Sequence, residues 1–199
     1  MNYRKILIEL FLFLIVNNLN STEHFLGVFY YREAYHVFEL ENDSTSTCIN
    51  YPSFNIKIKE NIDFKYDNNS MVMNYIKDTL RIEMLFHKMG EVYRGPMNIL
   101  GFGCPVTVYK IDTTIFKDYP LFEGKYYNLE TFDTISVFNI DNKILIQSSK
   151  IAGFFYPIDA EMGFTETGIK VNFQFRQDRI WQLEFYFDNR NQYYYRIDK

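Results

Sequence analysis

The sequence predicts an all-β protein made of short antiparallel strands, with few and short helices. Phe and Tyr are abundant, at 20 and 17 residues beside a single Trp, and aromatic side chains pack well on pleated strands. Apolar and polar residues alternate with a period of two in many segments. Turn residues separate these segments at short intervals, which is typical of sandwiches and barrels.

The clearest alternation lies near the C-terminus. Segment 169–176 places four apolar side chains on one face, and 177–179 can then turn the chain. Segment 181–187 alternates again, which predicts a hairpin. A second turn at 188–191 leads to a closing strand at 192–197, so this region reads as a meander.

Shorter segments repeat the pattern upstream. Helix is expected only at 70–75 and 121–127. Asp141 and Asn142 suit a tight turn between two strands. We expect upstream strands at 54–58, 62–66, 80–86, 106–111, 134–140 and 143–147.

The N-terminus predicts export. Arg4 and Lys5 precede an apolar stretch at 6–16, which is shorter than the roughly 20 residues that span a bilayer. We expect residues 1–21 to be a signal peptide cut near Ser21. The alternative is a buried amphipathic helix, but 6–16 has no polar face. Residues 22–199 then form one secreted, extracellular β domain without an anchor.

The net charge of the chain limits the kinds of partner that we expect. The net charge is −4, and no run of Lys or Arg is long enough to follow a phosphate backbone. Nucleic acid and anionic membranes are therefore not expected as partners.

Two cysteines, Cys48 and Cys104, lie in the part that remains after processing. In an oxidising compartment an even pair predicts one disulfide, which would stabilise the fold by roughly 4 kcal/mol. The alternative is two free buried thiols. Neither a metal nor another cofactor is expected, because these cysteines and the scattered histidines make no ligand spacing; the histidines are His24, His36 and His87.

Two sequons suit a secreted chain. Asn42 and Asn68 each begin an Asn-x-Ser sequence in a polar, turn-like segment. We expect both asparagines to be glycosylation sites on the surface.

No catalytic constellation is present, so the sequence predicts a protein that is not an enzyme. A Gly-x-Ser-x-Gly elbow is absent. Asp159 and Glu161 would share one face of a strand, a spacing that suits acid–base chemistry or Ca²⁺, but other calcium-loop ligands are missing. A secreted hydrolase using these two carboxylates stays as an alternative.

Three segments of the second half, 151–159, 168–173 and 180–185, resemble the nidogen-type extracellular domain, also seen in plexin-domain-containing proteins. Gly153 stands where that family usually has Pro, and Phe155 where it often has Trp. The resemblance implies an antiparallel β-sandwich. Segment 30–75 is also similar to secreted egg proteins of blood flukes, which implies an exported parasite protein without catalytic residues.

These observations favour a non-enzymatic extracellular domain that binds a protein or a matrix component. Tyrosine runs at 30–31, 126–127 and 193–195 could form a recognition surface, although half of each run points inward on a strand. The alternative is a lipocalin-like carrier of a small apolar ligand, in which Gly27, Val28 and Phe29 stand in for the start of that fold. A closed eight-stranded cup with an apolar cavity would support the carrier, and a filled core would reject it.

Overall fold

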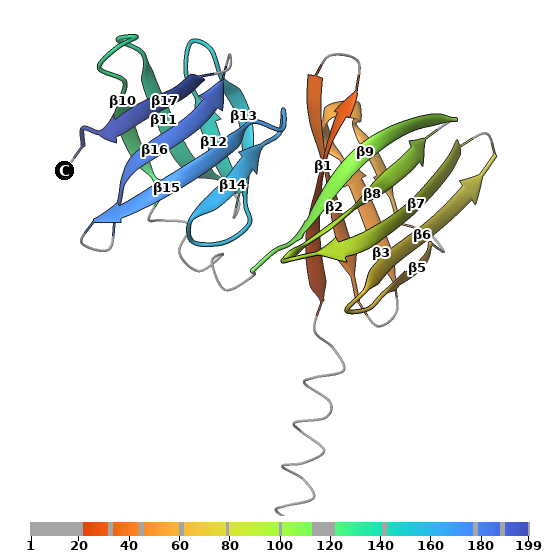
Figure 1. The fold of residues 1–199 in the computed structure, drawn as a ribbon. Coiled ribbons are helices and arrows are strands. Elements are labelled where there is room, and N and C mark those ends of the chain that lie inside the picture. The colour runs from red at the N-terminus through yellow and green to blue at the C-terminus, as the bar shows by residue number, and fades with distance from the viewer. Residues whose placement is uncertain are drawn as a thin grey trace, which may run out of the picture.

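The computed structural model describes residues 22–31, 34–43, 46–59, 62–78, 80–99, 101–112, 122–140, 143–176, 179–187 and 190–198. Strands dominate these residues, so the all-β prediction is confirmed. They form two units side by side, a nine-stranded antiparallel sheet and a closed eight-stranded barrel (Figure 1). The described residues include no helix long and apolar enough to cross a membrane.

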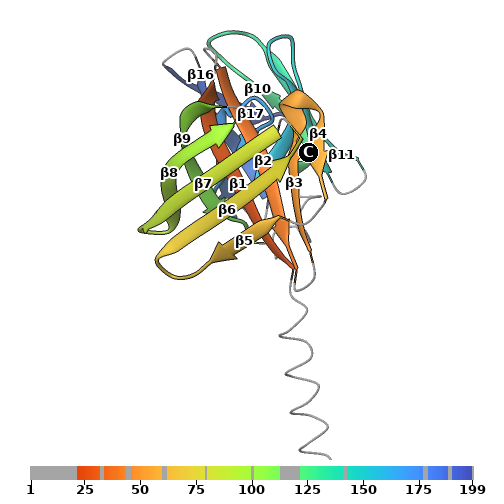
Figure 2. The same cartoon turned by 90° about the vertical axis from the view of Figure 1, so that its right-hand side faces the viewer.

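The nine-stranded sheet is a half-barrel. A short 3-10 turn, η1 (Pro52–Phe54), separates two of its strands. The sheet curls so that its last strands cross over its first ones, as Figure 2 shows, while the two edge strands, β4 and β5, stay unpaired with each other. In spatial order the strands are β4 (Ile56–Ile58), β3 (Thr47–Tyr51), β2 (Ala34–Asn42), β1 (Glu23–Tyr31), β9 (Phe102–Lys110), β8 (Val92–Ile99), β7 (Leu80–Met89), β6 (Ser70–Lys77) and β5 (Asp63–Tyr66).

Alternation along these strands builds the interior of the half-barrel. In β7 the buried Ile82, Met84 and Phe86 are each followed by a less buried residue on the other face. The same pattern runs through β6, where Met71 and Met73 are buried. The helix expected at 70–75 is therefore wrong: β6 pairs along its whole length with β7, and its apolar residues recur every second position.

The barrel closes because its first strand pairs with its last, at Tyr126 with Arg196 and at Tyr127 with Tyr195. The helix expected at 121–127 is also wrong, since 124–127 form a strand; residue 121 lies outside the described residues. The strands are β10 (Gly124–Tyr127), β11 (Thr134–Ile140), β12 (Lys143–Gln147), β13 (Ala152–Pro157), β14 (Met162–Thr165), β15 (Lys170–Arg176), β16 (Arg179–Phe187) and β17 (Arg190–Arg196).

A third apolar cluster joins the two units. Leu26, Val28 and Val37 on the outer face of β1 and β2 pack against Tyr156, Ile158 and Phe164 of the barrel. The amide of Asp112 also donates a hydrogen bond to the carbonyl of Ile158 at 2.8 Å. The sequence-based sandwich thus differs in arrangement from the structure, in which each sheet curves around its own core and only a small apolar face is shared.

Candidate functional site

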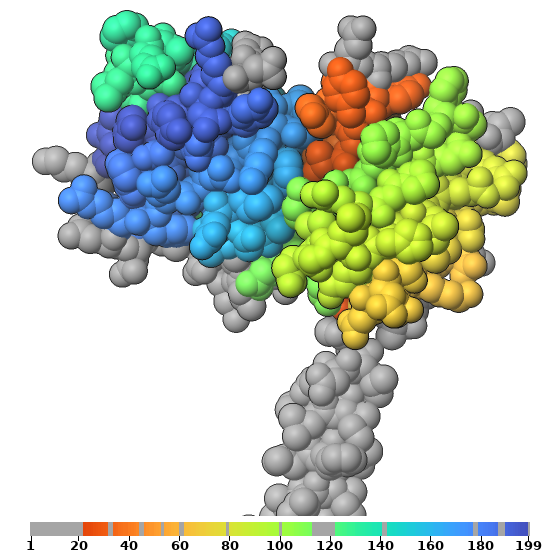
Figure 3. Space-filling model, viewed as in Figure 1, coloured from red at the N-terminus to blue at the C-terminus, as the bar shows by residue number. Residues whose placement is uncertain are grey.

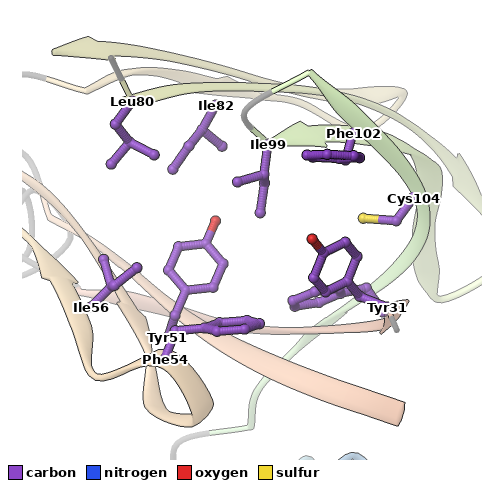
Figure 4. Close-up of a pocket in the computed structure, with 10 residues that line it drawn as sticks. Tyr31, Tyr51, Phe54, Ile56, Leu80, Ile82, Ile99, Phe102 and Cys104 are labelled. Atoms are coloured by element: carbon purple, nitrogen blue, oxygen red, sulfur yellow. The ribbon is translucent and has the colours of Figure 1, made fainter. Parts of the chain in front are cut away.

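One end of the half-barrel holds a pocket of about 200 Å³. It lies where β1 and β3 end and where β4, β7 and β9 begin (Figure 4). Ten residues line it: Phe29, Tyr31, Tyr51, Phe54, Ile56, Leu80, Ile82, Ile99, Phe102 and Cys104.

The floor of the pocket is the core of the half-barrel. Phe29, Tyr51 and Ile82 are buried there and belong to the same apolar cluster. Figure 4 shows the hydroxyl groups of Tyr31 and Tyr51 pointing across the cavity towards the opposite wall. The Tyr51 hydroxyl donates to the sulfur of Met97 at 3.8 Å, which leaves its oxygen able to accept a hydrogen bond.

The rim carries large apolar side chains in contact with solvent. Phe54, Ile56 and Phe102 are 40%, 39% and 58% exposed. Phe54 stacks on the imidazole of His36, with ring centres 4.9 Å apart, and the His36 ring nitrogen Nε2 lies 3.1 Å from the carbonyl oxygen of Tyr31. Exposed apolar residues around a concave surface are typical of a binding site.

The described residues that line the pocket include no charged side chain. Burial raises the pKa of the Tyr51 phenol well above its usual range and also raises the pKa of the Cys104 thiol. The Cys104 thiol donates to the carbonyl of Met97 at 3.6 Å. Both groups therefore stay neutral at physiological pH, and the pocket offers an apolar surface with hydroxyl groups and one thiol.

This size and lining suit one small apolar molecule. An engineered apolar cavity of roughly 150 Å³ lined by Leu, Ile and Phe stays dry and binds benzene. The pocket is somewhat larger than that cavity. It therefore has room for a single-ring compound with a short side chain.

The predicted disulfide is wrong, because Cys48 and Cys104 are both free. Cys104 belongs to the core of the half-barrel, as do Ile49 and Tyr51. Cys48 directly precedes Ile49 in β3, so alternation turns its side chain to the opposite face of the strand, beside Glu41 of β2. A disulfide needs Cβ atoms roughly 4 Å apart on the same side, which this arrangement excludes.

The predicted carboxylate pair does not share a strand face. Asp159 and Glu161 lie in the turn between β13 and β14. The Asp159 carboxylate accepts hydrogen bonds from the amides of Glu161 and Met162, at 2.7 and 2.8 Å. Asp159 therefore stabilises a turn and is not aimed at a common substrate with Glu161.

The three histidines are not brought together. His24 lies in β1, 3.8 Å from a Glu41 oxygen, and His87 lies exposed in β7. Only His36 approaches the pocket, through its stacking on Phe54. Within the described ranges no group of His, Cys, Asp or Glu has metal-binding geometry.

The two expected glycosylation sites differ in exposure. Asn68 is exposed in the turn between β5 and β6, which the Asp67 carboxylate fixes by accepting the amide hydrogens of Asn69 and Ser70. Asn42 is part-buried at the end of β2, and its side-chain oxygen accepts a hydrogen bond from the Thr47 hydroxyl at 2.8 Å.

Apolar side chains pack against one another inside the described part of the closed barrel. Its interior is occupied by packed aromatic side chains, in which Phe173 lies edge-to-face with Phe122 and with Phe155 at centroid distances of 4.9 and 5.2 Å. Gly27 and Phe29, proposed as the start of a lipocalin-like fold, lie instead in β1 of the half-barrel, where Phe29 lines the pocket.

The sequence indicated one residue of the pocket, Tyr31, but not that it meets the other lining residues there. The tyrosine run at 30–31 was a candidate recognition surface, and alternation sends Tyr31 into the pocket and Tyr30 to the outer face. Tyr126 and Tyr194 of the other two runs are buried. The signal that was missed is the presence of large apolar residues at several strand ends, including Tyr51, Leu80 and Phe102.

Comparison with known proteins adds no relative. A scan against protein-family models gives no match, and a search of curated proteins finds no similar sequence. The nidogen-type and fluke egg-protein resemblances accordingly stay predictions.

Proposed function

We propose that this chain binds and carries a small, single-ring apolar ligand in the pocket of the half-barrel. The observation that supports this most is a cavity of about 200 Å³ whose described lining is uncharged, with an apolar rim and with the packed core as its floor. Ligand pockets are typically concave, mostly apolar and equipped with a few polar groups. Here Tyr51 supplies such a group, since its oxygen can accept a hydrogen bond from a ligand hydroxyl.

Binding of 4-propylphenol, measured by isothermal titration calorimetry, tests the proposal. We expect saturable binding with one molecule per chain, and weaker binding of propylbenzene, which has no hydroxyl to donate. Replacing Ile99 by Phe should fill the cavity, because the Ile99 side chain points into it (Figure 4). We expect at least tenfold weaker binding in Ile99→Phe.

Ile76→Phe is the matched control. Ile76 is 68% exposed in β6 and does not line the pocket. It should bind 4-propylphenol like the unmodified protein. The absence of saturable binding, or equal binding by the Ile99 and Ile76 variants, would contradict the proposal.

A second role, contact with an extracellular protein or matrix component, is favoured by aromatic side chains exposed away from the pocket. Tyr30, Tyr35 and Tyr186 are 48%, 55% and 56% exposed. Tyrosine supplies a large contact area at low entropic cost. Solid-phase binding to individual purified matrix proteins tests this role; it requires saturable binding that weakens when Tyr30 and Tyr186 are replaced by Ser.

Both roles are proposed for an exported protein. The support is the basic and apolar sequence of the first 21 residues. Expression of the full chain in a secreting eukaryotic host should yield protein in the medium whose N-terminus starts near Ser21 or Thr22. Retention of all the protein in the cells with an intact Met1 would contradict export.

A further inference from the structure

A second concave surface lies between the half-barrel and the closed barrel. This groove has a volume of about 760 Å³, and it is more open than the pocket. Figure 3 shows this side of the molecule, where the orange surface of β1 and β2 lies between the blue barrel and the green strands β8 and β9. The two units therefore create a surface that neither has alone.

Glycine and proline residues of β8 and β9 line part of the floor of the groove. Pro96 of β8 and Pro105 of β9 are directly paired across the strands, and Gly95 and Gly103 lie beside them. At the base Tyr109 packs against Phe164 of the barrel with ring centres 5.2 Å apart.

Tyrosine side chains form the walls. Tyr30 and Tyr35 are neighbours across β1 and β2, with an edge-to-face contact at 5.1 Å, and Tyr186 of the barrel also lines the groove. Gly168 of the barrel allows the two walls to lie close together, because a Cβ atom at this position would lie only 2.4 Å from the Cβ of Tyr35. Its φ of +74° also favours glycine.

Among the described residues that line the groove, the charged side chains are all basic. Arg94 and Lys170 both line it and are exposed, and this described lining includes no Asp or Glu. Throughout the described part of the chain, neither cation forms an ion pair. In a protein with a net charge of −4 this is a local site for an anion.

The neighbouring backbone argues against an extended peptide. The strands that form the groove, including β1, β8, β9 and β15, are each paired on both sides, so none offers a free edge for strand addition. Recognition here must use side chains. The exposed aromatic rings offer faces for the C–H surfaces of sugar rings, and Arg binds carboxylate or sulfate groups in bidentate fashion.

We propose that the groove binds an acidic oligosaccharide. Its carboxylate or sulfate groups would lie against Arg94 and Lys170, and its sugar rings against Tyr30, Tyr35 and Tyr186. This site is separate from the apolar pocket and does not depend on the carrier function. It includes Tyr30, Tyr35 and Tyr186, the tyrosines of the second proposed role, and it names an acidic oligosaccharide as what they contact.

Calorimetric titration of the purified protein with a heparin-derived tetrasaccharide tests the proposal. We expect saturable binding that weakens as salt is added, and at least tenfold weaker binding after Arg94→Gln and Lys170→Gln together. The control is Lys88→Gln with Arg179→Gln, which removes the same charge from two exposed residues outside the groove. The control should bind the tetrasaccharide like the unmodified protein. Unchanged melting temperatures in both double variants would show that the fold is intact.

Three outcomes would overturn the proposal. The first is no saturable binding of the tetrasaccharide, and the second is equal loss of affinity in the two double variants. The third is binding of a hexaglutamate peptide that matches or exceeds binding of the tetrasaccharide, which would assign the groove to acidic peptides. A Tyr186→Ala variant adds a readout of ring contact, since it should weaken tetrasaccharide binding at high salt as well as at low salt.

Discussion

At the scale of the residue, Glu39 is a carboxylate placed where water is largely removed. It lies on the face of β2 that meets the barrel, and burial raises its pKa above the usual range. The Asn50 side chain donates to its oxygen at 2.6 Å, and Lys143 of the barrel also favours the charged form. Asn50 and Lys143 offset only part of the free energy that burial of the charged carboxylate costs, so the pKa of Glu39 stays raised.

The ionised form of Glu39 should therefore destabilise the folded protein. A carboxyl whose folded pKa is raised favours the folded state at low pH and loses that contribution as pH rises beyond about 4.3, the ordinary value for Glu. We expect Glu39→Gln to melt at a higher temperature than the unmodified protein at pH 7, and the difference to shrink towards pH 4. Glu91→Gln, at an exposed position in the turn between β7 and β8, is the control for the loss of one negative charge outside β2.

At the scale of the element, β1 is the strand on which the half-barrel depends. It pairs with β2 and β9. Its side chains pack both in the core of the half-barrel and in the apolar cluster that joins the two units. Gly27 lets the ring of Phe38 cross the strand, because a Cβ at position 27 would lie 2.1 Å from that ring.

Gly27→Ala should displace the fully buried Phe38 and lower the free energy of unfolding by about 1–3 kcal/mol. Gly103→Ala in β9 is the matched control, since no atom lies within 4 Å of its added methyl group. Its effect should stay within about 0.5 kcal/mol. Urea unfolding of both variants measures the difference, and equal stabilities would contradict this account of β1.

Strands could be predicted from the sequence far better than their assembly. The segments 134–140 and 143–147 match β11 and β12, because alternation reports directly which side chains face a core. Alternation does not report which strands meet, so the division into a half-barrel and a barrel was not predicted. The helix expected at 70–75 is wrong because Met71, Met73 and Tyr75 recur every second position, which is the period of a strand that faces a core.

The candidate site was harder to predict for the same reason. Its residues come from strand ends far apart in the sequence, such as Phe29, Leu80 and Phe102, and only the curl of the sheet brings them together. The disulfide prediction is wrong for a reason that alternation contains: Ile49 and Tyr51 face the core, so Cys48, one residue before Ile49, faces away from it.

At the scale of the whole molecule, two separate cores are held together by one small apolar cluster. Val37 is fully buried at its centre, on the face of β2 that contacts the barrel. A charge at this position would be buried without a partner, which typically costs about 3–5 kcal/mol. The cores of the two units would keep their own contacts.

Val37→Asp should therefore uncouple the two units. We expect the unmodified protein to unfold in one calorimetric transition and the variant in two, with a larger radius of gyration by small-angle X-ray scattering. Ile76→Asp, at an exposed position, should keep the single transition. A single transition in Val37→Asp, at an unchanged radius of gyration, would refute the role of this apolar cluster in holding the two units together.

The central place of β1 also governs how the chain must fold during synthesis. β1 can pair with β2 at once, but its other neighbour, β9, ends only at Lys110. At about 5–20 residues per second, a ribosome takes several seconds to deliver that strand. Throughout that interval one edge of β1 presents unpaired backbone groups, so the nascent chain should depend on chaperones until the ninth strand emerges.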